Sequence, residues 1–173
     1  MLEDLLTAPG VVGFVRYLDS PETRVAVILP GLASLAVLSF YARSGRVSVR
    51  LQLLWLFAVL ISYLTARWVV TSEVEQLYIY SAFSVACAVL LFKRIYVPPP
   101  LAFALTFFSL WWVDVIQAFW RALECDAPIE LFFHGVGGAG ARDALLLVPL
   151  LTAAFIAYGA NRIRARGERL AEL

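Results

Sequence analysis

Apolar residues in this chain form long stretches that short polar or charged turns separate. A helix of about 20 apolar residues crosses a bilayer. Five stretches meet or approach this length, and we predict a transmembrane helix for each: about 25–42, 51–70, 73–92, 101–123 and 144–161. The predicted fold class is therefore an all-α polytopic membrane protein, a bundle of five transmembrane helices that forms one domain over residues 1–173.

Several local signals mark the ends of these helices. Ser20 followed by Pro21 predicts an N-cap with proline in the first turn, and Gly45 suits a left-handed C-cap. Ser-Glu-Val-Glu at 72–75 fits a capping box. The three prolines at 98–100 end one helix and begin the next.

The composition agrees with a lipid environment. Hydrophobic residues make up 62% of the chain, charged residues 16%, and the mean hydropathy is +0.82. Soluble domains are about 45–50% apolar. A soluble chain of this size leaves about a third of its unfolded surface exposed, which is too much for so apolar a sequence. We therefore expect the lipid bilayer to be a partner of the chain.

Most of the 14 basic residues lie in three segments, 43–50, 93–94 and 162–169, and five spans place all three on one side of the membrane. The positive-inside rule makes that side cytoplasmic. We predict an inner (plasma) membrane protein with its N-terminus outside and a basic, helical cytoplasmic tail over about 162–173. Each cluster flanks an apolar segment, so no nucleic-acid partner is expected.

Two segments lie outside the predicted spans. Residues 3–18 are too short to cross a bilayer and contain Pro9-Gly10, so we expect an interfacial helix on the outer surface, with a re-entrant element as the alternative. Residues 124–143 form a long outer loop.

The outer loop contains the sequence FFHGVGGAGARD at 132–143, which fits the dinucleotide pattern G-x-G-x-x-G. That pattern binds a nucleotide only inside a βαβ unit, and here a membrane helix follows instead. Three interpretations remain: a flexible turn, the tip of a re-entrant element, or an anion site for a lipid headgroup at the helix start with Arg142.

Polar side chains in the same loop are candidates for contact with a substrate or partner. They are Asp126, Glu130, His134 and Arg142. A zinc site needs three or four suitably spaced ligands. Pro128 and the glycines disfavour the helix that would align the acidic residues with His134, so we expect no metal and no cofactor.

Three polar residues within the predicted spans form a candidate intramembrane cluster: Arg67, Asp114 and Gln117. A charge at mid-bilayer costs at least about 2.5 kcal/mol, so it normally has a partner or a role. Arg67 and Asp114 lie at similar predicted depths, roughly 24 and 20 Å from the inner surface, which predicts an ion pair. The pair could fix helix packing, or it could line a proton or substrate path.

The fourth span carries paired aromatics at 107–108 and 111–112. Such a surface suits lipid, or an aromatic, pigment-like or quinone-like ligand, and both interpretations stay open. Lipid is the default interpretation.

No convincing nucleophile, metal or cofactor motif stands out, so we do not expect an independent enzyme. The leading hypothesis is a non-catalytic integral subunit or assembly factor of a larger bacterial inner-membrane complex, with other membrane subunits as partners. The alternative is a small homo-oligomeric transporter or channel that uses the Arg67, Asp114 and Gln117 cluster. A third hypothesis is a membrane enzyme that acts on a lipid-linked substrate through Asp126, Glu130 or His134.

Overall fold

The computed structural model describes residues 15–45, 48–70, 75–79, 97–124, 136 and 143–171, with only the backbone given for 67–70, 75–79, 121–124 and 160–171. Its elements are α3 (Pro21–Thr23), the π-helical turn η1 (Arg24–Ile28), α4 (Leu29–Arg43), α5 (Val49–Thr65), β1 (Ala66–Val70), β2 (Glu75–Ile79), α7 (Pro99–Glu124) and α8 (Ala144–Ala171). The described part of the chain is therefore mostly helical.

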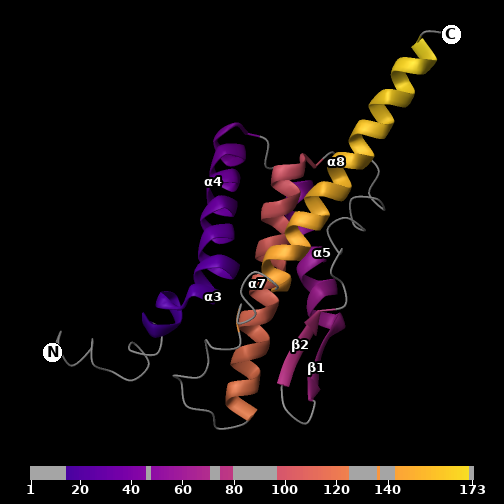
Figure 1. Ribbon diagram of the computed structural model, residues 1–173. Coiled ribbons are helices and arrows are strands. Elements are labelled where there is room, and N and C mark those ends of the chain that lie inside the picture. The colour runs from indigo at the N-terminus through magenta and orange to yellow at the C-terminus, as the bar shows by residue number, and fades with distance from the viewer. Residues whose placement is uncertain are drawn as a thin grey trace.

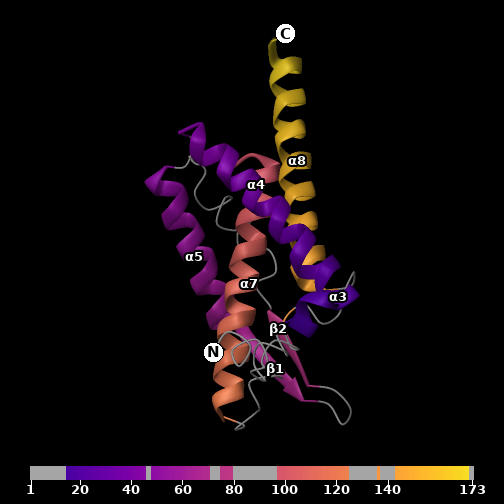
Figure 2. The ribbon, with the colours of Figure 1, turned by 90° about the vertical axis from the view of Figure 1, so that its left-hand side faces the viewer.

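Helix α7 stands at the centre of a helical bundle, and α4, α5 and α8 each pack against it (Figure 1). Helices α4 and α8 run antiparallel to α7, whereas α5 runs parallel to it (Figure 2). The C-terminal part of α8 projects beyond the end of the bundle at which α4 finishes (Figure 1).

The first predicted helix and both of its boundary signals are confirmed. The Ser20 side chain accepts a hydrogen bond from the Thr23 backbone N at 3.2 Å, and Pro21 occupies the first turn. At the other end Gly45 has a φ of 66°, the left-handed conformation that glycine adopts without strain. Between these ends η1 forms just before Pro30, which has no N–H to donate and whose ring would crowd the preceding turn of an α-helix.

Two predicted helices are wrong in part. The second was expected over 51–70 but ends at Thr65, and residues 66–70 and 75–79 pair as an antiparallel hairpin, with Ala66 opposite Ile79 and Val70 opposite Glu75. The aromatic and β-branched residues in β1 favour a strand over a helix. The remainder of the predicted 73–92 helix, with residues 72–74 of its capping box, lies outside the described residues.

The last two predicted segments are confirmed as helices. Helix α7 includes all of 101–123 and begins at Pro99, within the proline run. Helix α8 begins at Ala144, where the Asp143 carboxylate accepts a hydrogen bond from the Leu145 backbone N at 2.8 Å. It continues to Ala171, so most of the basic tail is helical.

The segment predicted as an interfacial helix is described only from residue 15. Residues 15–19 are helical and end at Ser20, whose backbone N donates to the Arg16 carbonyl at 3.1 Å. Residues 3–14 lie outside the described part of the chain.

Buried side chains form two clusters along α7. One, near the start of α5 and α7, contains Leu51, Leu54, Ala58, Val97, Leu101, Ala102 and Leu105. The other, toward the far end of α7, contains Tyr17, Phe107, Leu110, Ala118, Val136 and Leu145. Phe107 is the largest fully buried side chain among the described residues, at 1% exposure.

Large apolar side chains are nevertheless exposed on every long helix. Examples are Leu32 and Phe40 on α4, Leu53 and Leu60 on α5, Trp120 on α7, and Leu151 and Phe155 on α8. By length and composition, the helical stretches Pro21–Arg43 and Pro99–Trp120 could each cross a membrane. Val49–Thr65 and Ala144–Gly159 are shorter apolar helices.

Candidate functional site

The predicted intramembrane cluster lies on one helix and one strand. Asp114 and Gln117 lie on α7, three residues apart, and both are half-buried. Arg67 was expected on a membrane helix but lies on strand β1, and only its backbone is described. The Arg67–Asp114 ion pair therefore stays a prediction.

The negative charge of Asp114 affects the pKa of a tyrosine that is not among the predicted site residues. Tyr17 is 5% exposed and belongs to the buried cluster with Phe107 and Leu145. Burial, followed by the negative charge of Asp114, raises the pKa of Tyr17 to about 12. A hydrogen bond with Thr23 lowers the pKa by less, and the charge of Asp143 adds the smallest upward effect. The phenol is therefore neutral at physiological pH.

A short chain of hydroxyl groups holds Tyr17 in place. Ser20 Oγ donates to Thr23 Oγ1 at 2.8 Å, and the Thr23 side chain is hydrogen-bonded to Tyr17. Thr23 itself is 2% exposed. Ser20 ends the helical segment 15–19 and caps α3, so Tyr17 and Thr23 lie on either side of a helix boundary. Helical spacing in the sequence gives no signal for their contact.

This arrangement is suited to packing rather than proton transfer. A general acid or base works best with a pKa near the working pH, and Tyr17 lies far above that range. Because its ring joins α7 and α8 residues in one cluster, Tyr17 fastens the segment before α3 onto the bundle.

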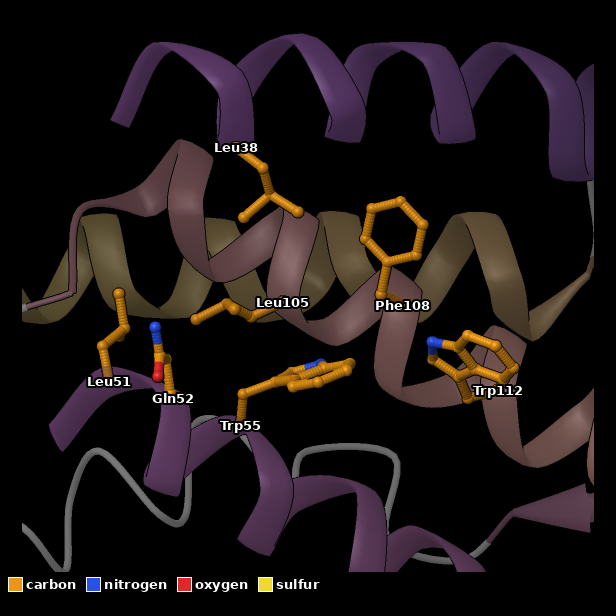
Figure 3. Close-up of a pocket in the computed structure, with 7 residues that line it drawn as sticks. All are labelled: Leu38, Leu51, Gln52, Trp55, Leu105, Phe108 and Trp112. Atoms are coloured by element: carbon orange, nitrogen blue, oxygen red, sulfur yellow. The ribbon is translucent and has the colours of Figure 1, made fainter. Parts of the chain in front are cut away.

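A second site is an apolar pocket between α4, α5 and α7, with a volume of about 290 Å³ (Figure 3). Its lining residues are Leu38 from α4, Leu51, Gln52 and Trp55 from α5, and Leu105, Phe108 and Trp112 from α7. Gln52 and Trp112 are exposed, so the pocket opens sideways on the bundle.

Trp55 gives this pocket its polar feature. The Trp55 indole Nε1 is buried and has no hydrogen-bond partner within the described part of the chain. In Figure 3 the indole lies beneath Leu105 and Phe108, in the space that the pocket residues surround. Buried indole N–H groups usually find an acceptor, so this one is a candidate donor to a ligand.

The predicted outer-loop residues Asp126, Glu130, His134 and Arg142 lie outside the described residues, as do the glycines of the loop. Val136, from the middle of that loop, is described: it is 1% exposed and packs in the cluster of Tyr17 and Leu145. Among the residues that the structure describes, no group of three His, Cys, Asp or Glu side chains could hold a metal ion.

No protein-family model, no curated protein and no solved structure matches the chain.

Proposed function

We propose that the protein is an integral membrane protein that serves as a non-catalytic subunit or assembly factor of a larger inner-membrane complex. The observation that carries the proposal is the extent of apolar surface that the bundle leaves uncovered. Soluble proteins seldom expose large contiguous apolar patches, and such surfaces mark membrane or protein contacts.

Helix α5 shows this surface most clearly. Val49, Leu53, Leu56, Leu60 and Tyr63 are all at least 36% exposed, and they follow one another at alternating spacings of four and three residues. This spacing forms one continuous stripe along a helix and is the pattern with which one helix packs against another. We propose that this α5 stripe contacts a partner subunit.

The orientation of the bundle supports the proposed topology. Helices α4 and α8 point the same way, so the end of α4 at Arg43, the start of α5 at Arg50 and the helical tail over 162–169 lie toward one end of the bundle (Figure 1). Basic residues gathered at one end are typical of a cytoplasmic face. The proposed orientation is N-terminus outside and C-terminus inside.

Two measurements on the tagged full-length chain, expressed in its own host, test the proposal. Alkaline carbonate extraction of membranes should leave the protein in the pellet. Native mass spectrometry after gentle detergent extraction should then find it with other membrane proteins at fixed stoichiometry. Release by carbonate contradicts membrane integration, and a homo-oligomer alone contradicts the subunit role in favour of a transporter or channel.

A matched pair of variants locates the contact. The triple change Leu53→Ala, Leu56→Ala and Leu60→Ala should release the partner, because it removes the centre of the α5 stripe. The control triple, Leu29→Ala, Leu32→Ala and Leu35→Ala, alters equally exposed residues of α4 and should retain it. Loss of the partner from the α4 variant alone would contradict the assignment to α5.

A further inference from the structure

We propose that the pocket between α4, α5 and α7 binds one acyl chain of an anionic phospholipid, with the ester carbonyl at Trp55 Nε1 and the phosphate beside Arg43 and Arg50. This inference rests on the proposed membrane location. It adds a ligand class that the subunit role does not require.

The shape of the pocket favours a chain. On α7 its lining residues Leu105, Phe108 and Trp112 follow one another at spacings of three and four residues, so they share one helix face. From the first to the last the face extends about 10 Å along the helix axis. An acyl chain lying parallel to the helices would run along this face, whereas a compact ring would cover only part of it.

The polar groups of the pocket suit an ester. Trp55 Nε1 is a donor that is buried and unpartnered within the described residues, and Gln52 on the preceding turn of α5 can donate through its amide. A glycerol ester carbonyl accepts hydrogen bonds and donates none. It would satisfy the Trp55 indole while the chain beyond it contacts only apolar side chains.

Charge at one end of the pocket selects the headgroup. Arg50 directly precedes the lining residue Leu51, and Arg43 lies five residues beyond Leu38, about 7.5 Å along α4. Both arginines are exposed. A phosphate placed between them would sit just outside the membrane core, one or two helical turns from Trp55. The arginines, Trp55 and the apolar lining then follow one another in the same order as the phosphate, ester and acyl chain of a phospholipid.

Native mass spectrometry of the delipidated full-length protein tests the assignment, with dioleoyl phosphatidylglycerol, dioleoyl phosphatidylcholine and a short-chain ubiquinone as separate probes. Phosphatidylglycerol should bind most tightly. Trp55→Phe, which keeps an aromatic ring but removes the donor, should weaken its binding about fivefold. Arg43→Gln and Arg50→Gln should each weaken it by about the same factor.

Trp120→Phe and Arg16→Gln are the matched controls, because both residues are exposed and neither lines the pocket. They should bind phosphatidylglycerol as the unaltered protein does. Equal affinity for the two phospholipids, or no effect of Trp55→Phe in a variant with unchanged helix content, overturns the proposal. Tighter binding of ubiquinone that depends on Trp55 overturns it in favour of a quinone. None of these results changes carbonate extraction or partner stoichiometry, so the proposed function is judged separately.

Discussion

Tyr17 is buried close enough to Asp114 for the carboxylate charge to raise the pKa of the phenol, although the two residues come from opposite parts of the chain. Tyr17 lies in the helical segment before α3, and Asp114 lies in α7. Asp143, just before α8, adds a second negative charge. The Tyr17 side chain therefore lies where three segments meet: the segment before α3, the middle of α7 and the start of α8.

This relationship predicts a loss of stability at high pH. The folded-state pKa of Tyr17 is about 12 against an ordinary value of 10.0, so folding favours the neutral phenol. The stabilisation is complete below pH 10 and is lost as the pH rises from 10 through about 12, with an upper limit on the order of 3 kcal/mol. Thermal unfolding in detergent, followed by circular dichroism between pH 8 and 12, measures it.

Tyr17→Phe removes the titrating group and should flatten that part of the pH dependence. Absorbance at 295 nm should also lose a tyrosinate transition near pH 12 in this variant. The control is Tyr158→Phe, because Tyr158 is 58% exposed on α8. If the late transition persists in Tyr17→Phe and disappears in Tyr158→Phe, the proposed placement of Tyr17 is wrong.

The Ser20 hydroxyl should contribute measurably to the free energy of unfolding. It accepts from the Thr23 backbone N and donates to Thr23 Oγ1, which in turn holds Tyr17. Ser20→Ala should lower the free energy of unfolding by about 1 kcal/mol, the usual value for losing an N-cap. Urea titration in mild detergent gives the measurement.

Ser44→Ala is the control for that change, since the Ser44 hydroxyl donates to the Tyr41 carbonyl at an exposed helix end. Its effect should stay within about 0.5 kcal/mol. Equal effects of the two substitutions would mean that the Ser20 network adds nothing beyond an ordinary surface hydrogen bond.

The local signals of the sequence explain which parts of the fold could be predicted. Ser20 with Pro21, Gly45 and the proline run at 98–100 act on the backbone next to them, so helix ends could be placed without knowing any long-range contact. The hairpin could not, because the apolar run after Thr65 continues the helical pattern and only its aromatic and β-branched residues favour a strand.

Less of the candidate site than of the helix ends could be predicted, because the site depends on contacts between segments that are distant in the sequence. Asp114 could be singled out because a charge within an apolar helix is costly anywhere. Its effect on Tyr17 depends on how the first segment packs against α7, which no local pattern encodes. The pocket around Trp55 likewise arises from three helices together, and the paired aromatics of α7 indicated only that an aromatic surface would exist.

Two glycines should respond to alanine in opposite ways. A Cβ at Gly31 would lie 3.5 Å from the Phe107 ring, an ordinary contact, and alanine is the better helix former, so Gly31→Ala should be neutral or stabilising by up to about 1 kcal/mol. Gly45 has open space around it but a φ of 66°, so Gly45→Ala should destabilise by about 1 kcal/mol. Thermal unfolding of both variants measures these changes in stability. If Gly31→Ala destabilises the protein more than Gly45→Ala does, the assigned packing of α4 on α7 is wrong.

The proposed topology predicts which exposed positions a membrane-impermeant maleimide can reach in intact cells. In a chain with Cys87→Ser and Cys125→Ser, the change Ser44→Cys places a thiol at the turn after α4, near Arg43 at the proposed cytoplasmic end. Glu22→Cys places one at the opposite end of the same helical stretch. Both positions are exposed.

We expect Glu22→Cys to be labelled in intact cells, because the first turn of the helix would face outward, and Ser44→Cys to be labelled only after the membrane is opened. The two variants serve as controls for each other. They lie at opposite ends of one helical stretch, so if that stretch crosses the membrane they must lie on opposite sides of it. Labelling of Ser44→Cys alone would reverse the orientation. Labelling of both in intact cells would mean that Pro21–Arg43 does not cross the membrane, and the bundle would then have to shield its exposed leucines with partner proteins rather than lipid.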